Sequence, residues 1–268
     1  MKRRNFIIKF LIGLIGFVTL DAFWFEKYII EWNIFDISNG NENKLKAIQL
    51  SDLHLREIQS THKSLAEQIN KELPDVLFIT GDAITRNSRI PILSEFLALI
   101  DHKIQKVAIL GNKEYAGRVN LYLLRKTYES NNCILLINES YQLKTRFRTI
   151  NIIGIDDFVC GYPDFLSAVK NIDKSLALVV LNHCPAYRST IDEHSTKLNL
   201  KPIILAGHTH GGQVTFFGTP VMTPYGSGKY VKGWYSNEIS QMYVSKGIGT
   251  TLLPIRIGAR AETSIFYV

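Results

Sequence analysis

The sequence lacks the features that mark several classes of protein. It has only three cysteines, Cys133, Cys160 and Cys184, which are too few and too scattered for a disulfide framework or a CxxC metal pattern. It has no run of five like charges, and we therefore expect no nucleic-acid partner. Only one stretch is apolar enough to approach a membrane span, which excludes a polytopic membrane protein.

The composition is that of a folded domain. The 268 residues are 46% hydrophobic and 21% charged, which excludes a disordered or collagen-like chain. The net charge of +7 is spread along the chain and is compatible with binding to an anionic membrane surface or an anionic substrate. The length fits one domain with an appendage. We predict an N-terminal segment over residues 1–32 and a single domain over residues 44–268.

The N-terminal segment predicts a membrane anchor. Basic residues 2–4 precede an apolar run over residues 6–25, which as a helix would measure roughly 30 Å. Trp24, Tyr28 and Trp32 would form an aromatic belt at its far end. We expect a single retained anchor in a bacterial inner membrane, in contact with the membrane surface, and leave the side of the domain open. The paired arginines resemble a twin-arginine export signal equally well.

From residue 44 onward, short apolar runs alternate with helical patterns. Runs rich in Val, Ile and Leu predict strands buried on both faces, and apolar residues three and four apart predict helices. The predicted strands are Ala47–Leu50, Val76–Thr80, Val107–Leu110, Ile150–Ile155, Leu176–Leu181 and Ile203–Ala206. The predicted helices are 62–73, 91–103, 118–130 and 163–171. This alternation predicts an α/β fold, and the chain after residue 211 predicts antiparallel strands with long loops.

Polar side chains follow five of these predicted strands. They are Asp52 and His54, Asp82, Asn112, His183, and His208 with His210. Because open α/β sheets bind ligands at the carboxyl ends of their strands, we expect these groups to converge. Alternate residues of a strand point the same way, so each Asp-x-His or His-x-His pair should face one ion. Mixed nitrogen and oxygen donors suit divalent Mn, Fe, Co or Zn, and seven ligands fit two ions that share one carboxylate.

This set of motifs resembles the calcineurin-like metallophosphoesterases. The resemblance covers about residues 44–268 and rests on Asp52-x-His54, Gly81-Asp82, Gly111-Asn112, His183 and Gly207-His208-Thr209-His210. The blocks 207–213 and 247–260 are similar to one bacterial subgroup. Members of that subgroup carry an N-terminal anchor or a twin-arginine signal, and some are UDP-2,3-diacylglucosamine pyrophosphatases. The resemblance implies a four-layer α/β/β/α sandwich, to which the N-terminal hydrophobic helix would be added.

The resemblance also implies how the ligands divide between two divalent metal ions. Asp52, His54 and His210 would hold the first ion, Asn112, His183 and His208 would hold the second, and Asp82 would bridge them. A hydroxide between the ions would attack phosphorus in line. Manganese is the first choice of metal, with iron, zinc and cobalt as alternatives.

One position departs from the family pattern. The family reads Gly-Asn-His-Asp/Glu, where the histidine protonates the leaving group or stabilises the transition state, and this chain has Lys113 in that place. A lysine there favours a leaving group that needs little protonation, such as the phosphate released from a pyrophosphate. We predict that Lys113 and His183 take part in catalysis and that Arg56 and Arg256 contact the substrate.

The predicted function is that of a two-metal phosphohydrolase for a phosphorylated, lipid-linked small molecule. UDP-2,3-diacylglucosamine, an intermediate of lipid A synthesis, is the specific expectation. The alternatives are an exported phosphodiesterase of the cell envelope and a catalytically weakened metal-binding homologue, the latter because of Lys113. The sequence leaves the oligomeric state open.

Overall fold

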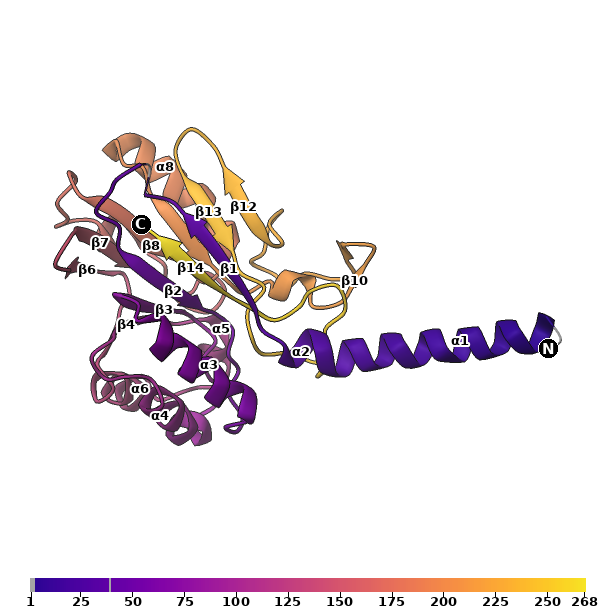
Figure 1. The fold of residues 1–268 in the computed structure, drawn as a ribbon. Helices are drawn as coiled ribbons and strands as arrows, with labels where there is room; N and C mark the ends of the chain where they lie inside the picture. Colours follow the sequence, from indigo (N-terminus) through magenta and orange to yellow (C-terminus); the bar gives the residue numbers. More distant parts are fainter. Residues whose placement is uncertain (1–2, 39) are drawn as a thin grey trace.

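Two six-stranded sheets form the body of the protein in the computed structural model, which describes residues 3–38 and 40–268 (Figure 1). In spatial order, the first sheet consists of β1 (Glu31–Asp36), β14 (Glu262–Tyr267), β2 (Lys46–Leu50), β3 (Val76–Thr80), β4 (Gln105–Ile109) and β5 (Cys133–Leu135). The second consists of β12 (Gly233–Ser236), β13 (Gln241–Val244), β9 (Ile203–Ala206), β8 (Ala177–Leu181), β7 (Thr149–Gly154) and β6 (Glu139–Lys144). A separate hairpin pairs β10 (Thr215–Phe216) with β11 (Thr219–Pro220).

The six predicted strands all form, each within two residues of its predicted ends. β2, β3, β4 and β5 run parallel in the first sheet, as do β7, β8, β9 and β13 in the second. The tail is only partly antiparallel, since β14 is antiparallel to β2 but β13 is parallel to β9. β1, β5, β6, β11 and β12 have no counterpart among the predicted runs. β1 begins at Glu31 and lies upstream of residue 44, where we expected the domain to start.

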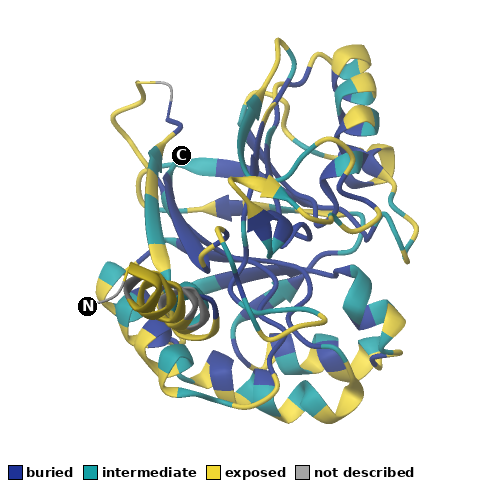
Figure 2. Ribbon diagram, turned by 90° about the vertical axis from the view of Figure 1, so that its right-hand side faces the viewer, coloured by how far each residue is buried: buried dark blue, intermediate teal, exposed yellow. Residues whose placement is uncertain are grey.

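The two sheets pack face to face over a shared core. Phe78 of β3, Ile152 of β7 and Phe266 of β14 are fully buried in this layer. Figure 2 shows the buried residues concentrated along the sheets, while the helices turn an exposed side outward. Because both faces of each sheet are covered, the central strands have continuous apolar sequences instead of alternating ones.

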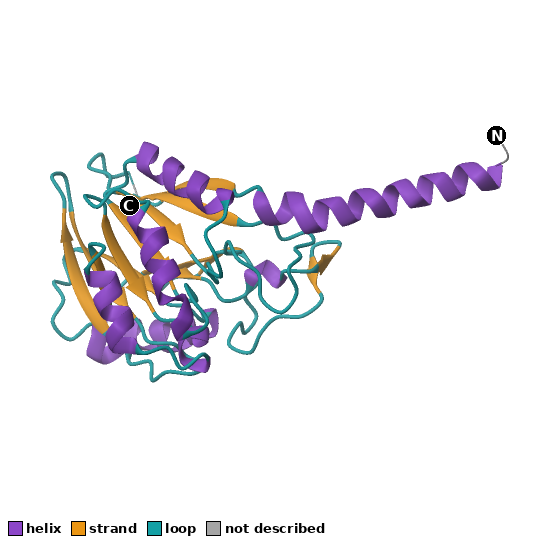
Figure 3. Ribbon diagram, turned by 90° about the horizontal axis from the view of Figure 1, so that it is seen from below, coloured by secondary structure: helices purple, strands orange, loops and turns teal. Residues whose placement is uncertain are grey.

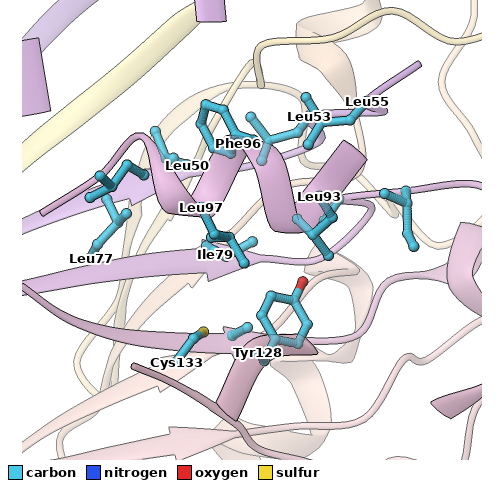
Figure 4. Close-up of a cluster of buried hydrophobic side chains, with 14 of the residues drawn as sticks. Leu50, Leu53, Leu55, Leu77, Ile79, Leu93, Phe96, Leu97, Tyr128 and Cys133 are labelled. Atoms are coloured by element: carbon cyan, nitrogen blue, oxygen red, sulfur yellow. The ribbon is translucent and has the colours of Figure 1, made fainter. Parts of the chain in front are cut away.

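Helices cover the outer face of each sheet. The helices over the first sheet are α3 (Ser60–Glu72), α4 (Ile90–Ala98) and α6 (Leu121–Glu129), and those over the second are α7 (Phe165–Ala168) and α8 (Arg188–Leu198). Phe96 of α4 and Tyr128 of α6 pack in one buried cluster with Leu50 and Ile79 of the sheet (Figure 4). The layers therefore follow the order helices, sheet, sheet, helices, and the predicted α/β class is confirmed.

The N-terminal helix corrects a prediction. Helix α1 (Arg3–Leu20) projects from the body and continues through a π-helical turn (Asp21–Phe25) into the short helix α2 (Glu26–Tyr28) (Figure 3). Over the ranges 3–38 and 40–268, no helix is both long and apolar enough to cross a membrane. The predicted single anchor over residues 1–32 in a bacterial inner membrane is therefore wrong. The α-helix ends after 18 residues, and three of them are basic. Trp32 packs against the buried cluster between the first sheet and its helices instead of forming an aromatic belt.

We predict that Phe78→Ala destabilises the fold, because it leaves a cavity between the two sheets. Deleting a buried phenylalanine side chain lowers the free energy of unfolding by about 3–5 kcal/mol. Urea unfolding measures the change, and Phe147→Ala is the matched control, since Phe147 is 58% exposed. The control substitution at the surface should change the free energy of unfolding by no more than about 0.5 kcal/mol. Equal midpoints for the two variants would contradict this account of the core.

Candidate metal site

The predicted ligands follow five strands that end at one place in the fold. β2, β3 and β4 run parallel in the first sheet, and β8 and β9 run parallel in the second, so the carboxyl ends of each set share one edge. The structure brings all seven side chains predicted as ligands into one connected cluster. Its triplets of donor atoms lie within 4.8 Å of one another, and they include Asp52 with His54 and His210, and Asp52 with Asp82 and His183. Asn112 Oδ1 lies 3.1 Å from His208 Nδ1.

The backbone at these strand ends is left-handed. Five of the seven residues have positive φ angles: Asp52 (53°), His54 (45°), Asp82 (53°), His208 (73°) and His210 (52°). Such a conformation costs roughly 1–2 kcal/mol for a residue with a side chain. The residues lie beyond the last strand residue, so the alternation of a strand does not align each pair as we predicted. The left-handed turns align them instead, and such strain is common at functional sites.

Two histidines have their tautomers fixed by carbonyl groups. His183 Nδ1 lies 2.8 Å from the Thr80 carbonyl oxygen, and His208 Nε2 lies 2.7 Å from the Tyr225 carbonyl oxygen. A carbonyl oxygen only accepts, so each of these nitrogens donates. The other nitrogen of each ring, Nε2 of His183 and Nδ1 of His208, therefore faces the cluster and is the atom that would bind a metal. This arrangement is typical of histidines that bind a metal.

Two buried polar atoms of the cluster lack a hydrogen-bond partner. Asp52 Oδ2 accepts from the Ser51 hydroxyl at 2.6 Å and from the His208 backbone N–H at 2.9 Å. Asp52 Oδ1 has no hydrogen-bond partner among the described residues, although His210 Nε2 lies 3.3 Å from it. His183 Nε2 is also buried without a partner in that part of the chain. The Nε2 atoms of His54 and His210 lie 3.0 Å apart, so one ring can donate to the other, and both atoms are close enough to bind one ion. A buried polar atom without a hydrogen bond is costly unless a cation or another partner binds it, and this mixture of carboxylate and imidazole donors fits a divalent metal.

Burial and charge prepare these groups as ligands. Burial lowers the pKa of His54, His208 and His210, which keeps their imidazoles neutral. Burial also acts on Asp82 and would raise its pKa, but the adjacent His183 lowers it overall. Burial alone would lower the pKa of His183, whereas Asp82 and the other carboxylates raise it to about 10, so a metal that binds Nε2 has to displace a proton. The carboxylates thus create a negative potential that favours a cation in the cluster.

Glu114 supports the site, and the sequence analysis assigned it no role. It lies in helix α5 (Asn112–Ala116) and is 1% exposed. Its carboxylate accepts from the backbone N–H groups of Gly111 at 3.0 Å, Asp82 at 3.2 Å and Ile84 at 3.0 Å. Burial and the neighbouring Asp82 raise its pKa to about 8. Glu114 therefore ties the loop after β3 to the loop after β4. The sequence feature that could have revealed this role is the position of Glu114 in the run Gly-Asn-Lys-Glu, directly after a predicted strand.

Cys184 is close to the cluster but is held as a thiol. Its Sγ lies near His183 and His208 and donates to Asp157 Oδ1 at 3.1 Å. Burial and the Asp157 carboxylate raise the pKa of this thiol well above its usual range. Because the thiolate is the form that binds metals, Cys184 is poorly prepared to be a ligand.

The remaining predicted residues occupy different places. Lys113 is half-buried, and its backbone N–H donates to Asp82 Oδ1 at 2.8 Å. Arg56 is exposed and lines a cavity together with His54. Arg256 does not match its predicted role in substrate contact, because its guanidinium is fully buried. It donates to the carbonyl groups of Lys246, Gly247, Gly249 and Ala259 and so holds the loop that follows β13.

We predict that Gly111→Ala disturbs the site while the fold survives. A Cβ atom on Gly111 would lie 2.3 Å from Asp82 Oδ1, so the Asp82 carboxylate would have to move. We expect the metal affinity to fall roughly tenfold or more, as it does when an outer-shell contact is lost. Metal analysis by mass spectrometry measures the loss, and Gly16→Ala, where a Cβ atom meets nothing within 4 Å, is the control. Full metal content in both variants would contradict the prediction.

The fold and the donor cluster are those of a metal-dependent phosphoester hydrolase. Residues 45–212 match the family of calcineurin-like phosphoesterases, and the chain belongs to that family, whose members use divalent metal ions. The chain is similar to the uncharacterized metallophosphoesterase YkoQ of Bacillus subtilis, with 28% identity over 240 residues and 84% of each chain covered. It is also similar to the UDP-2,3-diacylglucosamine pyrophosphatase LpxG of Chlamydia muridarum, with 26% identity over 264 residues that cover 76% of this chain and 78% of that protein. Among solved structures, a dimetal phosphatase from Danio rerio has 10% identity and a TM-score of 0.48 over 76% of this chain and 88% of its own.

Proposed function

We propose that this protein is a two-metal phosphohydrolase that cleaves a phosphodiester or a pyrophosphate. The observation that supports this most is the position of Asp82 between two donor sets. Asp82 Oδ2 lies 3.6 Å from His54 Nε2, and Asp82 Oδ1 lies 3.5 Å from His183 Nε2. Asp52, His54 and His210 would hold one ion, Asn112, His183 and His208 would hold the other, and Asp82 would belong to both.

The cations and the chain have separate tasks in this proposal. Two divalent ions would supply Lewis-acid stabilisation of the phosphoryl oxygens and a nucleophile at neutral pH. The chain's own groups keep the site fixed: the Ser51 hydroxyl and the His208 N–H hold one oxygen of Asp52, so that the other oxygen faces the cluster. Because these contacts form before the substrate binds, little reorganisation is needed during the reaction.

Lys113 has the task of stabilising charge on the phosphate in this proposal. Its backbone donates to Asp82, and so its side chain begins at the edge of the cluster. An ammonium group there offsets the negative charge that develops on the transferred phosphoryl group. The family pattern has a histidine in this position, and the change favours a pyrophosphate, whose leaving phosphate needs little protonation.

The substrate we propose is a lipid-linked pyrophosphate of the UDP-2,3-diacylglucosamine type, with manganese as the preferred ion. The Chlamydia relative supports this choice, since its name gives that activity and it covers most of the chain. The second candidate is a metal-binding homologue with weakened catalysis, which the replacement of histidine by Lys113 favours. Turnover of a simple phosphodiester separates the two.

We predict Mn²⁺-dependent release of p-nitrophenol from bis-p-nitrophenyl phosphate, with the activity lost after chelation and restored by Mn²⁺. Asp82→Asn should lower the rate more than about a hundredfold, because outer-shell changes alone cost 10–100-fold. It should also lower the metal content, since Asp82 would serve both ions. Asp101→Asn, at an exposed residue on another edge, is the control. Wild-type protein that binds metal but releases no p-nitrophenol would favour the weakened homologue.

We predict that Lys113→Ala lowers turnover of UDP-2,3-diacylglucosamine by about a hundredfold, the usual effect of removing one transition-state contact. Its metal content should change little, because the backbone N–H that reaches Asp82 remains. Lys103→Ala, at an exposed lysine, is the matched control. Equal rates for Lys113→Ala and the wild type would remove Lys113 from the mechanism.

A further inference from the structure

A cavity of about 260 Å³ opens directly beside the candidate metal site. His54 forms part of its wall, together with Arg56 and His62 from the region after β2. Lys27 and Thr250 also line it. Glu57 also lines the cavity, and its carboxylate accepts from the Gln59 side chain at 2.9 Å. Two cations, Lys27 and Arg56, therefore stand next to a proposed metal ligand, where an anionic group of a substrate would be stabilised.

A second cavity, of about 610 Å³, continues from the first. Tyr28, Gln59 and Thr61 line both cavities, so the two form one groove. The far part of the groove is lined by Trp24 and Ile29, which are 59% and 46% exposed, and by Ser60 and Ser64 at the start of α3. The side chains that line the groove thus include two cations at the end beside His54 and apolar groups at the end beside Trp24. We call it the N-terminal groove.

Its N-terminal wall is fixed to the body. The Ala22 carbonyl accepts from the Arg256 N–H at 3.1 Å, and the Glu26 carbonyl accepts from the Ala261 N–H at 2.8 Å. Glu26 Oε2 also accepts from the Ala259 N–H at 3.1 Å. The wall is therefore held to the loop that precedes β14 and is formed before any ligand arrives.

The aromatic side chains of the wall are ordered by one another. The rings of Trp24 and Tyr28 pack edge to face with centroids 5.3 Å apart, and Lys27 Nζ lies 4.7 Å from the Tyr28 ring centroid. The backbone beneath Trp24 is the π-helical turn (Asp21–Phe25), a feature that is frequent at functional sites. Such a preformed surface binds a ligand at low entropic cost.

We propose that the N-terminal groove binds the rest of an amphiphilic phosphoester whose reacting phosphorus lies at the metal site. This inference rests on the proposed function. The anionic part of the substrate lies between Lys27 and Arg56, and its apolar chain runs over Tyr28, Trp24 and Ile29. The order of charge and apolarity along the groove, continuous with the site, matches such a molecule. A small, fully polar ester would use only the end beside His54.

The test is a series of p-nitrophenyl alkyl phosphates with chains from methyl to octyl, used below the concentration at which they aggregate. The leaving group is the same throughout, so differences in kcat/KM report the contacts of the chain. Each buried methylene contributes a several-fold gain, so we expect kcat/KM to rise at least about tenfold from methyl to octyl. Trp24→Ala and Ile29→Ser should reduce this octyl-to-methyl ratio severalfold. Tyr122→Ala, at a residue 69% exposed on α6, should leave the ratio unchanged.

The outcomes separate the groove from the proposed function. An octyl-to-methyl ratio of kcat/KM near one in the wild type, or an unchanged ratio in both groove variants, would contradict the proposal that the groove binds the alkyl chain. Circular dichroism verifies that the variants are folded. If no ester is hydrolysed, the proposed function fails, and calorimetry then compares the binding of octyl phosphate and methyl phosphate. Affinity at least about tenfold higher for octyl phosphate in the wild type, and not in Trp24→Ala, supports the groove. Equal affinities overturn it.

Discussion

The candidate site depends on polar atoms that are buried without a hydrogen-bond partner. Asp52 Oδ1 and His183 Nε2 have lost water without gaining a hydrogen bond from the described part of the chain. In a folded protein this arrangement is unfavourable unless a cation restores the lost interactions. The Nε2 atoms of His54 and His210, 3.0 Å apart, can satisfy one another by a hydrogen bond and also lie close enough to share one cation. The fold therefore holds these atoms together only at a cost, and metal binding would contribute to the stability of the protein.

The left-handed backbone at Asp52, His54 and Asp82 has to be held in place by its surroundings, because isolated turns of this kind would relax. Parallel strands fix where each turn begins, and Glu114 connects the turns after β3 and β4 through three backbone N–H groups. Gly111 allows Asp82 to approach the backbone more closely than any side chain would permit. The site is thus maintained by backbone contacts as much as by the ligands themselves.

The sequence predicted the central strands and the convergence of the seven polar side chains, because buried strands have continuous apolar runs and parallel strands end at one edge. It did not predict the left-handed turns, since these depend on contacts between loops. Arg256 was assigned to the substrate because a sequence does not reveal which carbonyl groups surround a cation. The N-terminal segment was taken for an anchor from its apolarity, whereas β1 and Trp32 are drawn into the body by strand pairing and core packing.

The residues proposed to bind metal and those proposed to select the substrate lie in different parts of the chain. All seven proposed ligands lie within residues 45–212, the part that matches the family. The N-terminal groove is built differently: His54 and Arg56 belong to the matched part, but Trp24, Lys27 and Tyr28 precede it and Thr250 follows it. The hydrogen bonds that fix this wall also join residues 22–26 to residues 256–261, both outside the matched part. Changes at Trp24 or Lys27 would alter which phosphoesters bind without removing a proposed metal ligand, because no ligand lies in residues 22–28. Arg256 differs, since its guanidinium lies 3.4 Å from His210 Nδ1 and so reaches the metal site itself.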